Sequence, residues 1–392
     1  MAAAAGGSAA LLGSWWPRRA LAQKAADPAL KVEAEVELDA LARTHPHLHL
    51  ICTDTLAQLK YSFVVAASGK HPGTGNEFVE LSRSFVAGRK PRTKAAYEAG
   101  SRALLDAPPA TREAHFGRYA KRAPAAFASA KAEPPPRPSR PATLEDLRSF
   151  STPSSSVIDR PDAESAAKRA HDKDLADGKK WKQVEFYISE VRCIENTGGL
   201  FEGTDEIAMG GVGVGATGGT ERIKQFHVKD GFSPDKGSNV KKYEHGKRFA
   251  VFDVHPEAAF PHEYVVTLAM AELDDGGFGD FLEKLWKKVK GYVVAALAAA
   301  GGAIAGALSL SWIPGIGTAI GAIIGAFIGW LVSLFHNDDD IVGHRTRALR
   351  LYHATGSYYD KHELTTAKGI PVTMDFKDAG HYRVTGGWRL VA

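Results

Sequence analysis

The sequence predicts an α+β protein: a small N-terminal helical domain, a Pro-rich linker, and an antiparallel β-sandwich interrupted by a hydrophobic helical hairpin. Three observations lead to this fold class: helical spacing of apolar residues early in the chain, strand-like runs in its second half, and one long uncharged stretch between such runs. The 392 residues are enough for two or three domains. A net charge of +4 is too dilute for a nucleic-acid-binding protein.

Residues 1–22 precede this fold and are rich in alanine and glycine. A moderately apolar run ends in Ala-Leu-Ala at residues 20–22, which matches the A-x-A pattern of a signal-peptidase site. The segment resembles the hydrophobic and cleavage regions of a bacterial twin-arginine export signal, although Arg18 and Arg19 follow the apolar run instead of preceding it. The resemblance implies an exported protein of the periplasm, the cell envelope or the extracellular space. The alternative is an Ala-rich tail.

Residues 30–122 are expected to form the helical domain. Apolar residues recur at intervals of three and four between Asp54 and Tyr119, and Gly and Pro interrupt the pattern, so we expect three or four helices there. Leu30–Leu50 alternates apolar and polar residues, which leaves a strand or a short helix open. Residues 123–183 follow as a Pro- and Ser-rich linker with a polar helix, because their composition cannot supply a core.

Strand-like runs begin at Val184. Residues 184–277 contain five such runs and residues 337–392 resume the pattern, which predicts one β-sandwich in two parts. The two cysteines, Cys52 and Cys193, cannot form a disulfide framework, and whether they pair with each other stays open.

The hydrophobic insertion spans residues 278–336. Within it, 45 consecutive residues (291–335) carry no formal charge, which is twice the length that one helix needs to cross a bilayer. Pro314 and Gly315 near the middle break the helix, so the stretch predicts a hairpin with two arms. An amphipathic helix leads into the first arm.

The most specific signal is a repeat of glycines at every fourth position of the second arm. This spacing lines one helix face and lets another backbone approach closely, as in membrane helix packing. The repeat comprises Gly317, Gly321, Gly325 and Gly329, and the first arm contributes Gly302 and Gly306. The segment resembles the hydrophobic hairpins of pore-forming bacteriocins of the colicin type, and glycine-zipper membrane domains more generally. That resemblance implies insertion into a lipid bilayer.

Basic and aromatic residues flank the arms. Cationic side chains next to an apolar segment suit an anionic lipid surface, and tryptophans favour the membrane interface. We assign this role to Lys284, Lys287, Lys288 and Lys290 with Trp286, and to Trp312 at the tip of the hairpin.

These features predict an exported, membrane-active protein that inserts its hairpin and forms an oligomeric, toxin-like pore, with lipid and further copies of itself as partners. The alternative is a soluble homo-oligomeric binding protein whose hairpins build a shared helical core. We expect no enzyme, because the common hydrolase and nucleotide-binding motifs are absent; residues 213–218 match G-x-G-x-x-G but precede a strand-like run.

Acidic residues gather beside the predicted strands. They are Asp205, Glu206, Asp274, Asp275, Asp338 and Asp339. Carboxylates from several loops at one end of a sandwich are suitable calcium ligands, so the alternatives are a Ca²⁺ site and simply solvated loops. No other cofactor is expected. His45, His47 and His49 would share one side of a strand, which leaves a metal site or an ordinary strand open.

Overall fold

The computed structural model describes most of the helical and strand segments of the chain. The description covers Leu38 and residues 46–136, 181–195, 207–228, 232, 239–256, 262–272, 278–299, 316–335, 341–351, 370–377 and 380–391. The predicted mixture of helices and antiparallel strands is confirmed, because the described residues form seven α-helices, one 3₁₀ helix and eight strands.

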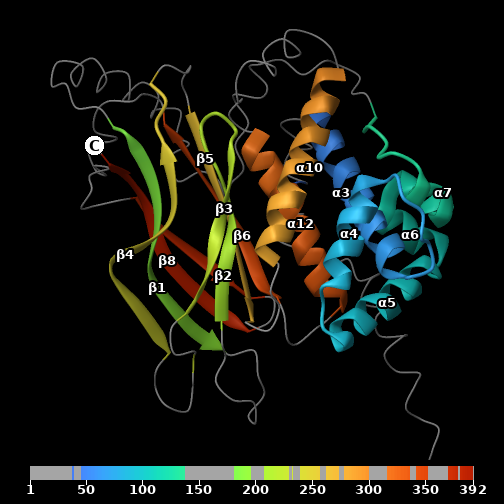
Figure 1. Cartoon of the computed structure of the whole chain (residues 1–392), viewed down its shortest axis with the longest axis horizontal. Coiled ribbons are helices and arrows are strands. Elements are labelled where there is room, and N and C mark those ends of the chain that lie inside the picture. The colour runs from blue at the N-terminus through green and yellow to red at the C-terminus, as the bar shows by residue number, and fades with distance from the viewer. Residues whose placement is uncertain are drawn as a thin grey trace, which may run out of the picture.

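The N-terminal helices pack together as one layer of the molecule (Figure 1). Proline stands at the start of several of them, where its missing N–H costs nothing. Asn76 caps one helix by accepting hydrogen bonds from the backbone N–H groups of Phe78 and Val79. The helices are α3 (Pro46–Ala67), α4 (Glu77–Ala87), α5 (Pro91–Leu105), α6 (Pro109–Phe116), the 3₁₀ helix η1 (Gly117–Lys121) and α7 (Pro124–Ser129).

Two of these helices bear on predictions made from the sequence, the strand-or-helix alternative before residue 50 and the linker after residue 122. Pro46–Leu50 belongs to α3, so the alternating pattern there is helical and not a strand. α7 lies inside the stretch that the sequence predicts as linker, and its Phe127 packs against Tyr61 with ring centroids 4.7 Å apart. The helical layer therefore continues beyond residue 122.

The strands form two four-stranded antiparallel sheets. Sheet I has the order β4-β1-β8-β7, and sheet II has the order β3-β2-β5-β6. Their bounds are β1 (Gln183–Glu195), β2 (Ile207–Val214), β3 (Thr220–His227), β4 (Val240–Asp253), β5 (His262–Glu272), β6 (Ile341–Leu351), β7 (Ile370–Phe376) and β8 (His381–Val391). Large apolar side chains from both sheets make one buried cluster, which we call the inter-sheet core.

Two helices, α10 (Phe278–Ala299) and α12 (Ile316–Phe335), lie between β5 and β6 in the chain. β5 and β6 are nevertheless neighbours in sheet II, with Thr267 opposite Thr346. The chain thus leaves sheet II, forms the two helices and returns beside the strand that it left.

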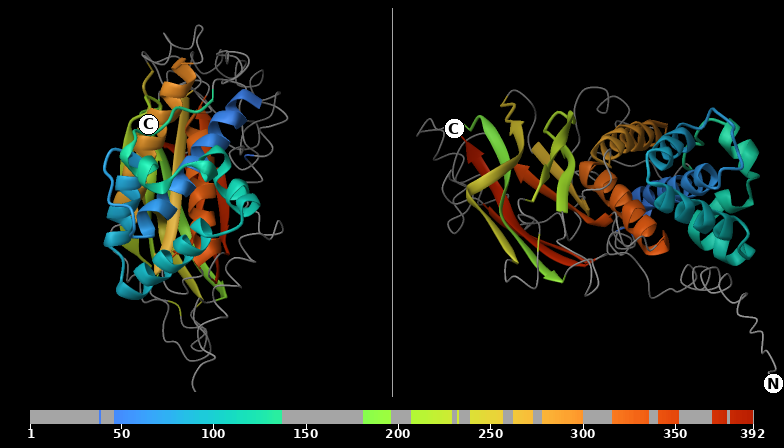
Figure 2. Two further views of the ribbon diagram at one scale, coloured as in Figure 1. Left: turned by 90° about the vertical axis from the view of Figure 1, so that its right-hand side faces the viewer. Right: turned by 60° about the horizontal axis from the view of Figure 1, so that its bottom comes forward.

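The helices α10 and α12 form a middle layer between sheet II and the N-terminal helices (Figure 2). α10 contacts β2 and β3, α12 contacts β5 and β6, and both also contact α3. A second buried cluster, which we call the helical core, joins the N-terminal helices, α10, α12 and the outward-facing residues of sheet II. The described residues therefore form two cores, one on each face of sheet II.

Candidate functional site

The helix α12 is enclosed on all sides. Each of its residues from Ile316 to Leu331 whose burial the structure describes is buried, although a surface helix would leave one face to solvent. On one side Phe63 of α3 contacts the rings of Phe327 and Trp330 at centroid distances of 6.1 and 6.3 Å. On the other side α12 lies against β5 and β6.

The glycine repeat of α12 includes a contact with the sheet. A Cβ atom added to Gly321 would lie 2.6 Å from Thr346 Cγ2, so only glycine lets α12 approach β6 this closely. The sequence predicts that these glycines pack against a second helix, but the partner of Gly321 is a strand. Gly317, Gly325 and Gly329 are buried as well. The remaining predicted residues of the hairpin lie outside the described residues. They are Gly302, Gly306, Pro314 and Gly315, which the sequence predicts to pack, and Trp312 at the tip.

The predicted lysines of α10 divide into two groups. Lys284 and Lys287 are exposed, whereas Lys288 forms an ion pair with Glu77 of α4 (Nζ–Oε2 3.1 Å). Lys290 is half-buried and donates to the carbonyl oxygen of Gly218 in the turn after β2; burial lowers its pKa. Two lysines thus face solvent and two bind α10 to its neighbours.

Aromatic contacts fix α10 to the N-terminal helices. Phe281 lies 4.1 Å from Phe85, and Tyr292 lies 5.5 Å from Phe78, measured between ring centroids. Trp286, which the sequence places at a lipid surface, is fully buried, because its face of the amphipathic helix points into the helical core. Its role at a lipid surface, which would need another arrangement of the chain, stays a prediction.

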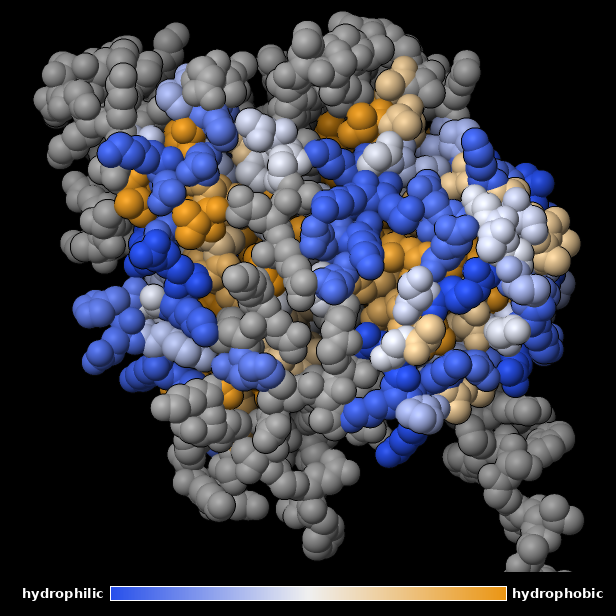
Figure 3. Space-filling model, in the orientation of Figure 1, coloured by the Kyte–Doolittle hydropathy of each residue, from blue (hydrophilic) through white to orange (hydrophobic). Residues whose placement is uncertain are grey.

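The C-terminal half of α10 presents an apolar surface. Gly291 and Ala295 are exposed, and Val294 and Ala298 are half-buried. Hydrophobic surface is visible over this upper end of the helix (Figure 3). α10 therefore shows solvent a basic first half and an apolar second half.

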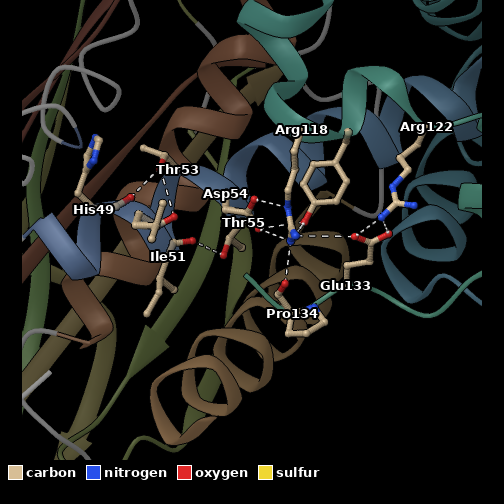
Figure 4. Close-up of polar contacts among 11 residues, drawn as sticks. His49, Ile51, Thr53, Asp54, Thr55, Arg118, Arg122, Glu133 and Pro134 are labelled. Carbon is tan, nitrogen blue, oxygen red and sulfur yellow. Dashed lines mark hydrogen bonds and ion pairs between the residues drawn. The ribbon is translucent and has the colours of Figure 1, made fainter. Parts of the chain in front are cut away.

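A polar cluster joins α3, η1 and the chain after α7; we call it the polar clasp, and it consists of Asp54, Arg118, Tyr119, Arg122 and Glu133 (Figure 4). Arg118 forms two parallel hydrogen bonds to Asp54 (2.8 and 3.0 Å), and Tyr119 donates to the same carboxylate (2.9 Å). Glu133 pairs with Arg122 at 2.7 Å. These bonds hold the segment that leaves the helical layer.

The electrostatics of the clasp indicate a structural role. Burial raises the pKa of Asp54, and the hydrogen bonds and charge of Arg118 act in the opposite direction. Burial also raises the pKa of Tyr119 and of nearby Tyr292. Because both Arg118 and Tyr119 bond the Asp54 carboxylate, the cluster ties η1 to α3. No sequence pattern points to this cluster, since Asp54 and Arg118 are 64 positions apart and share no local motif.

The helical core contains polar atoms that are buried without a hydrogen-bond partner. Both amide atoms of Gln58, the hydroxyl of Ser62 and the indole N–H of Trp286 belong to this group. Gln58 and Ser62 are four residues apart on α3, so they share one helix face. An unsatisfied buried group of this kind costs about 1–3 kcal/mol.

The face of sheet II under the two helices is also partly polar. Thr267 and Thr346 share a hydrogen bond of 2.9 Å, and Glu263 lies 3.9 Å from Arg350. His344 on β6 is buried, and its Nδ1 has no hydrogen-bond partner. The covered face of sheet II is therefore not purely apolar.

The acidic residues proposed for calcium all lie outside the described residues. The strand ends beside them converge, because Ile207 pairs with Glu272 and Ala271 pairs with Ile341 at one end of sheet II. Within the described helices and strands, no three His, Cys, Asp or Glu side chains come together in a way that would hold a metal ion. The calcium site stays a prediction.

Three smaller predictions concern the described residues. The glycine-rich motif at 213–218 connects β2 to β3, so it is a turn between strands, as its sequence context indicates. His47 and His49 lie in α3, so this part of the chain is a helix and not a strand. Cys52 and Cys193 are both buried, and neither of them is in a disulfide.

Comparisons of the chain with protein-family models, with curated proteins and with solved structures found no match. Of the helices in the part of the chain that the structure describes, none is both long enough and apolar enough to span a membrane.

Proposed function

We propose that this chain is an exported membrane-inserting protein and that the arrangement described above is its storage form. The hairpin formed by α10 and α12 is the inserting element, and the N-terminal helices and a β-sandwich made of sheets I and II shield it from water until it reaches a bilayer. The observation that carries the proposal is the enclosure of α12, a 20-residue helix without a charged side chain, in a middle layer that the chain enters and leaves beside neighbouring strands.

The polar atoms around the hairpin favour storage over a permanent core. Gln58, Ser62 and Trp286 each bury a polar group without a partner, and these groups regain hydrogen bonds to water when the layers separate. The Thr267–Thr346 pair and the Glu263–Arg350 pair on sheet II are likewise able to face water. Opening the middle layer therefore costs less than the buried apolar area alone would imply.

The exposed face of α10 supplies the first contact with lipid. Lys284 and Lys287 already face solvent in the storage form, and a basic side chain near an anionic bilayer contributes about 1 kcal/mol of attraction. The adjoining apolar surface of Gly291 and Ala295 can follow the lysines into the interface. Docking thus precedes release, and insertion of several copies would form the pore.

The alternative, a soluble oligomer with a shared helical core, needs open faces on α12. A single chain already covers the described residues of this helix from Ile316 to Leu331. A second copy would have to displace the chain's own layers before it could contribute to such a core. For this reason we favour insertion into lipid.

A reversible disulfide between α12 and β6 tests the proposal. The Cβ position of Gly321 lies 3.4 Å from Thr346 Cβ, close to the 3.5–4.5 Å that is typical of a disulfide. We therefore suggest Gly321→Cys with Thr346→Cys, combined with Cys52→Ala and Cys193→Ala to remove the native thiols. The assay is dye leakage from phosphatidylglycerol-containing vesicles at pH 7 and pH 5.

The oxidised protein should not cause leakage, and reduction of the disulfide should restore it to the level of the Cys52→Ala, Cys193→Ala parent. Each single cysteine variant serves as a matched control and should leak under both conditions. Equal leakage by the oxidised and reduced forms would show that release of α12 is not required. Failure of the parent to leak at either pH would refute membrane insertion itself.

A further inference from the structure

Two histidines lie on opposite sides of α12. His115 of α6 contacts it from the N-terminal helices, where the Nε1–H of Trp330 donates to His115 Nδ1 at 3.2 Å. The indole nitrogen is a donor only, so the accepting nitrogen of His115 carries no proton in this arrangement. Protonation of His115 Nδ1 would remove the hydrogen bond, because two N–H groups, one of His115 and one of Trp330, would then face each other.

His344 of β6 lies on the sheet side of α12. It pairs across the sheet with Ala269, whose side chain belongs to the helical core, and it is two residues from Thr346, which touches Gly321. Alternate residues of a strand share a face, so the His344 side chain is on the face that α12 covers. It is 5% exposed, and its Nδ1 has no partner.

The glycine repeat explains how α12 accommodates a histidine. Four helix residues rise about 6.0 Å and two strand residues about 6.6 Å, so every fourth helix position meets every second strand position. The chain returns from the end of α12 into the start of β6, which makes the two run antiparallel. With Gly321 against Thr346, such a register would place Gly325 closer to His344 than to Thr346.

The elements packed against His344 bring no carboxylate to its ring among the described residues. The segment Ile316–Phe335 of α12 has no titratable side chain, and the neighbouring outward-facing residues of β5 are Val265, Thr267 and Ala269. On β6 itself, Arg345 donates to the backbone carbonyl oxygen of His344 at 2.6 Å. A proton added to His344 would therefore meet a cation and no anion.

Two further acidic groups of these elements are already engaged. Glu263 on β5 faces Arg350, which is six residues from His344 along β6, or roughly 20 Å. Asp375 on β7 binds Arg383 and His381. Neither carboxylate is available to stabilise a charged His344.

Two charged groups near His115, Glu113 and Lys60, already contact other residues. Glu113 on α6 pairs with Lys121 at 3.1 Å, and Lys60 of α3 lies 5.6 Å from the centre of the Trp330 ring. A charged His115 would lose the hydrogen bond from Trp330, whose ring also contacts Lys60. On one side of α12 a hydrogen bond from Trp330 needs an unprotonated nitrogen of His115, and on the other side His344 is buried.

We propose that acid releases α12: protonation of His344 and His115 separates the middle layer from sheet II and from the N-terminal helices. The proposal rests on the storage form described above and names its trigger. It places the target bilayer in an acidic environment.

The sign of the effect follows from the pKa of His344. Burial, and secondarily the charge of Arg345, lowers it from 6.5 to about 3 in the storage form. After release the ring meets water and its pKa returns to about 6.5. The released form then binds one more proton, so storage is fully stable above pH 6.5 and weakens by about tenfold per pH unit between 6.5 and 3. At pH 4.5 release is favoured roughly 70-fold relative to pH 7 through this group alone.

Thiol labelling without lipid measures release directly. Ala348 lies on the covered face of β6 and is 3% exposed, so Ala348→Cys, in the Cys52→Ala, Cys193→Ala background, reports separation of the layers. The probe is 4,4′-dithiodipyridine, which reacts with thiols from pH 7 to pH 4.5. Each rate is divided by the rate with an unstructured cysteine peptide at the same pH.

The normalised rate should rise roughly 70-fold or more between pH 7 and pH 4.5. His344→Gln should reduce this rise to that caused by His115, and adding His115→Gln should leave less than a threefold change. His344→Arg, which carries a permanent charge, should label fast at every pH, whereas a Ser189→Ala control on β1 should behave as the parent. Near-ultraviolet circular dichroism at pH 7 checks that each variant is folded.

An undiminished rise in the double glutamine variant, or a flat profile in the parent, would overturn the acid trigger. Because this assay contains no lipid, it separates the trigger from the proposed function. Labelling that rises with acid while vesicles stay intact would refute insertion and leave the trigger standing. Leakage that is independent of pH would refute the acid trigger and leave insertion standing.

Discussion

The two faces of sheet II are formed by the same strands but carry different side chains. The inner face contributes large apolar side chains to the inter-sheet core, namely Met209, Tyr264, Val266, Leu268 and Met270. The outer face contributes smaller or polar side chains to the layer under α10 and α12, namely Val265, Thr267, Ala269, Thr346 and Ala348. Alternate residues of one strand therefore serve two different purposes.

The inner face of sheet II is therefore harder to expose than the outer face. Large interlocking side chains make the inner face costly to open, because burial contributes about 25 cal/mol per Å² of apolar surface. Small side chains on the outer face let helices approach closely, and the threonines remain compatible with water. The inter-sheet core is not free of unsatisfied atoms, since Trp388 Nε1 is one of them. Its neighbours, however, are aromatic rings and aliphatic side chains.

Truncating one tryptophan in each core should reveal the difference between the two cores most clearly. Trp388 is fully buried beside Phe186 and Phe252, at centroid distances of 4.8 and 6.3 Å. Trp388→Ala should lower the free energy of unfolding by about 3–5 kcal/mol, as is usual for a buried aromatic residue. Trp330→Ala makes a comparable cavity in the helical core and removes the hydrogen bond to His115. Urea denaturation measures both losses.

The two variants should differ in which amides lose protection from hydrogen exchange. Trp388→Ala should increase exchange in β1 and β8, which form the centre of sheet I. Trp330→Ala should increase exchange in α10, α12 and the N-terminal helices while β1 and β8 stay protected. Equal exchange of both regions in both variants would mean that the two cores unfold as one unit, and the distinction between them would fail.

Two serines on neighbouring helices test whether unpaired polar groups weaken the helical core. The Ser62 hydroxyl has no partner, whereas the Ser82 hydroxyl donates to the carbonyl oxygen of Phe78 at 2.8 Å. Ser82→Ala should cost about 0.5–1.5 kcal/mol, and Ser62→Ala should be neutral or stabilising. Gln58→Leu, which removes two unpaired atoms, should stabilise by about 1–3 kcal/mol and slow dye leakage. Destabilisation by both Ser62→Ala and Gln58→Leu would show that water or another group satisfies these atoms.

Periodicity predicted the mixture of helices and strands, because burial on one side leaves a repeat in the sequence. It predicted the amphipathic α10 for the same reason, but it could not tell lipid from protein as the environment of Trp286, since both are apolar. The glycines of α12 show a further limit. A spacing of four marks the face where a backbone approaches, yet a strand at two-residue intervals fits that spacing almost as well as a helix does.

The polar clasp had no signal in the sequence at all. Asp54 and Arg118 are joined by the packing of α3 against η1, and nothing in their local sequence indicates the pairing. His344 was equally hidden, because a single histidine among Arg345, Thr346 and Arg347 looks like part of an exposed strand. Its burial follows from the helix that covers it, which belongs to a different segment of the chain.

The smallest expected effect concerns the ion pair at the outer edge of the middle layer. Lys288 of α10 and Glu77 of α4 are both partly exposed, so Lys288→Glu should weaken the attachment of α10 to α4 by only about 0.2–1 kcal/mol. Combining it with Glu77→Lys should restore the loss, and 0.5 M salt should abolish the difference between the single and double variants. Lys287→Glu is the matched control, because Lys287 pairs within α10 with Glu283 and joins no two layers. If Lys287→Glu and Lys288→Glu accelerate labelling of Ala348→Cys equally, the effect reports the charge of α10 and not its attachment to α4. If only Lys288→Glu does so, α10 leaves the N-terminal helices when the hairpin is released, and both arms move together.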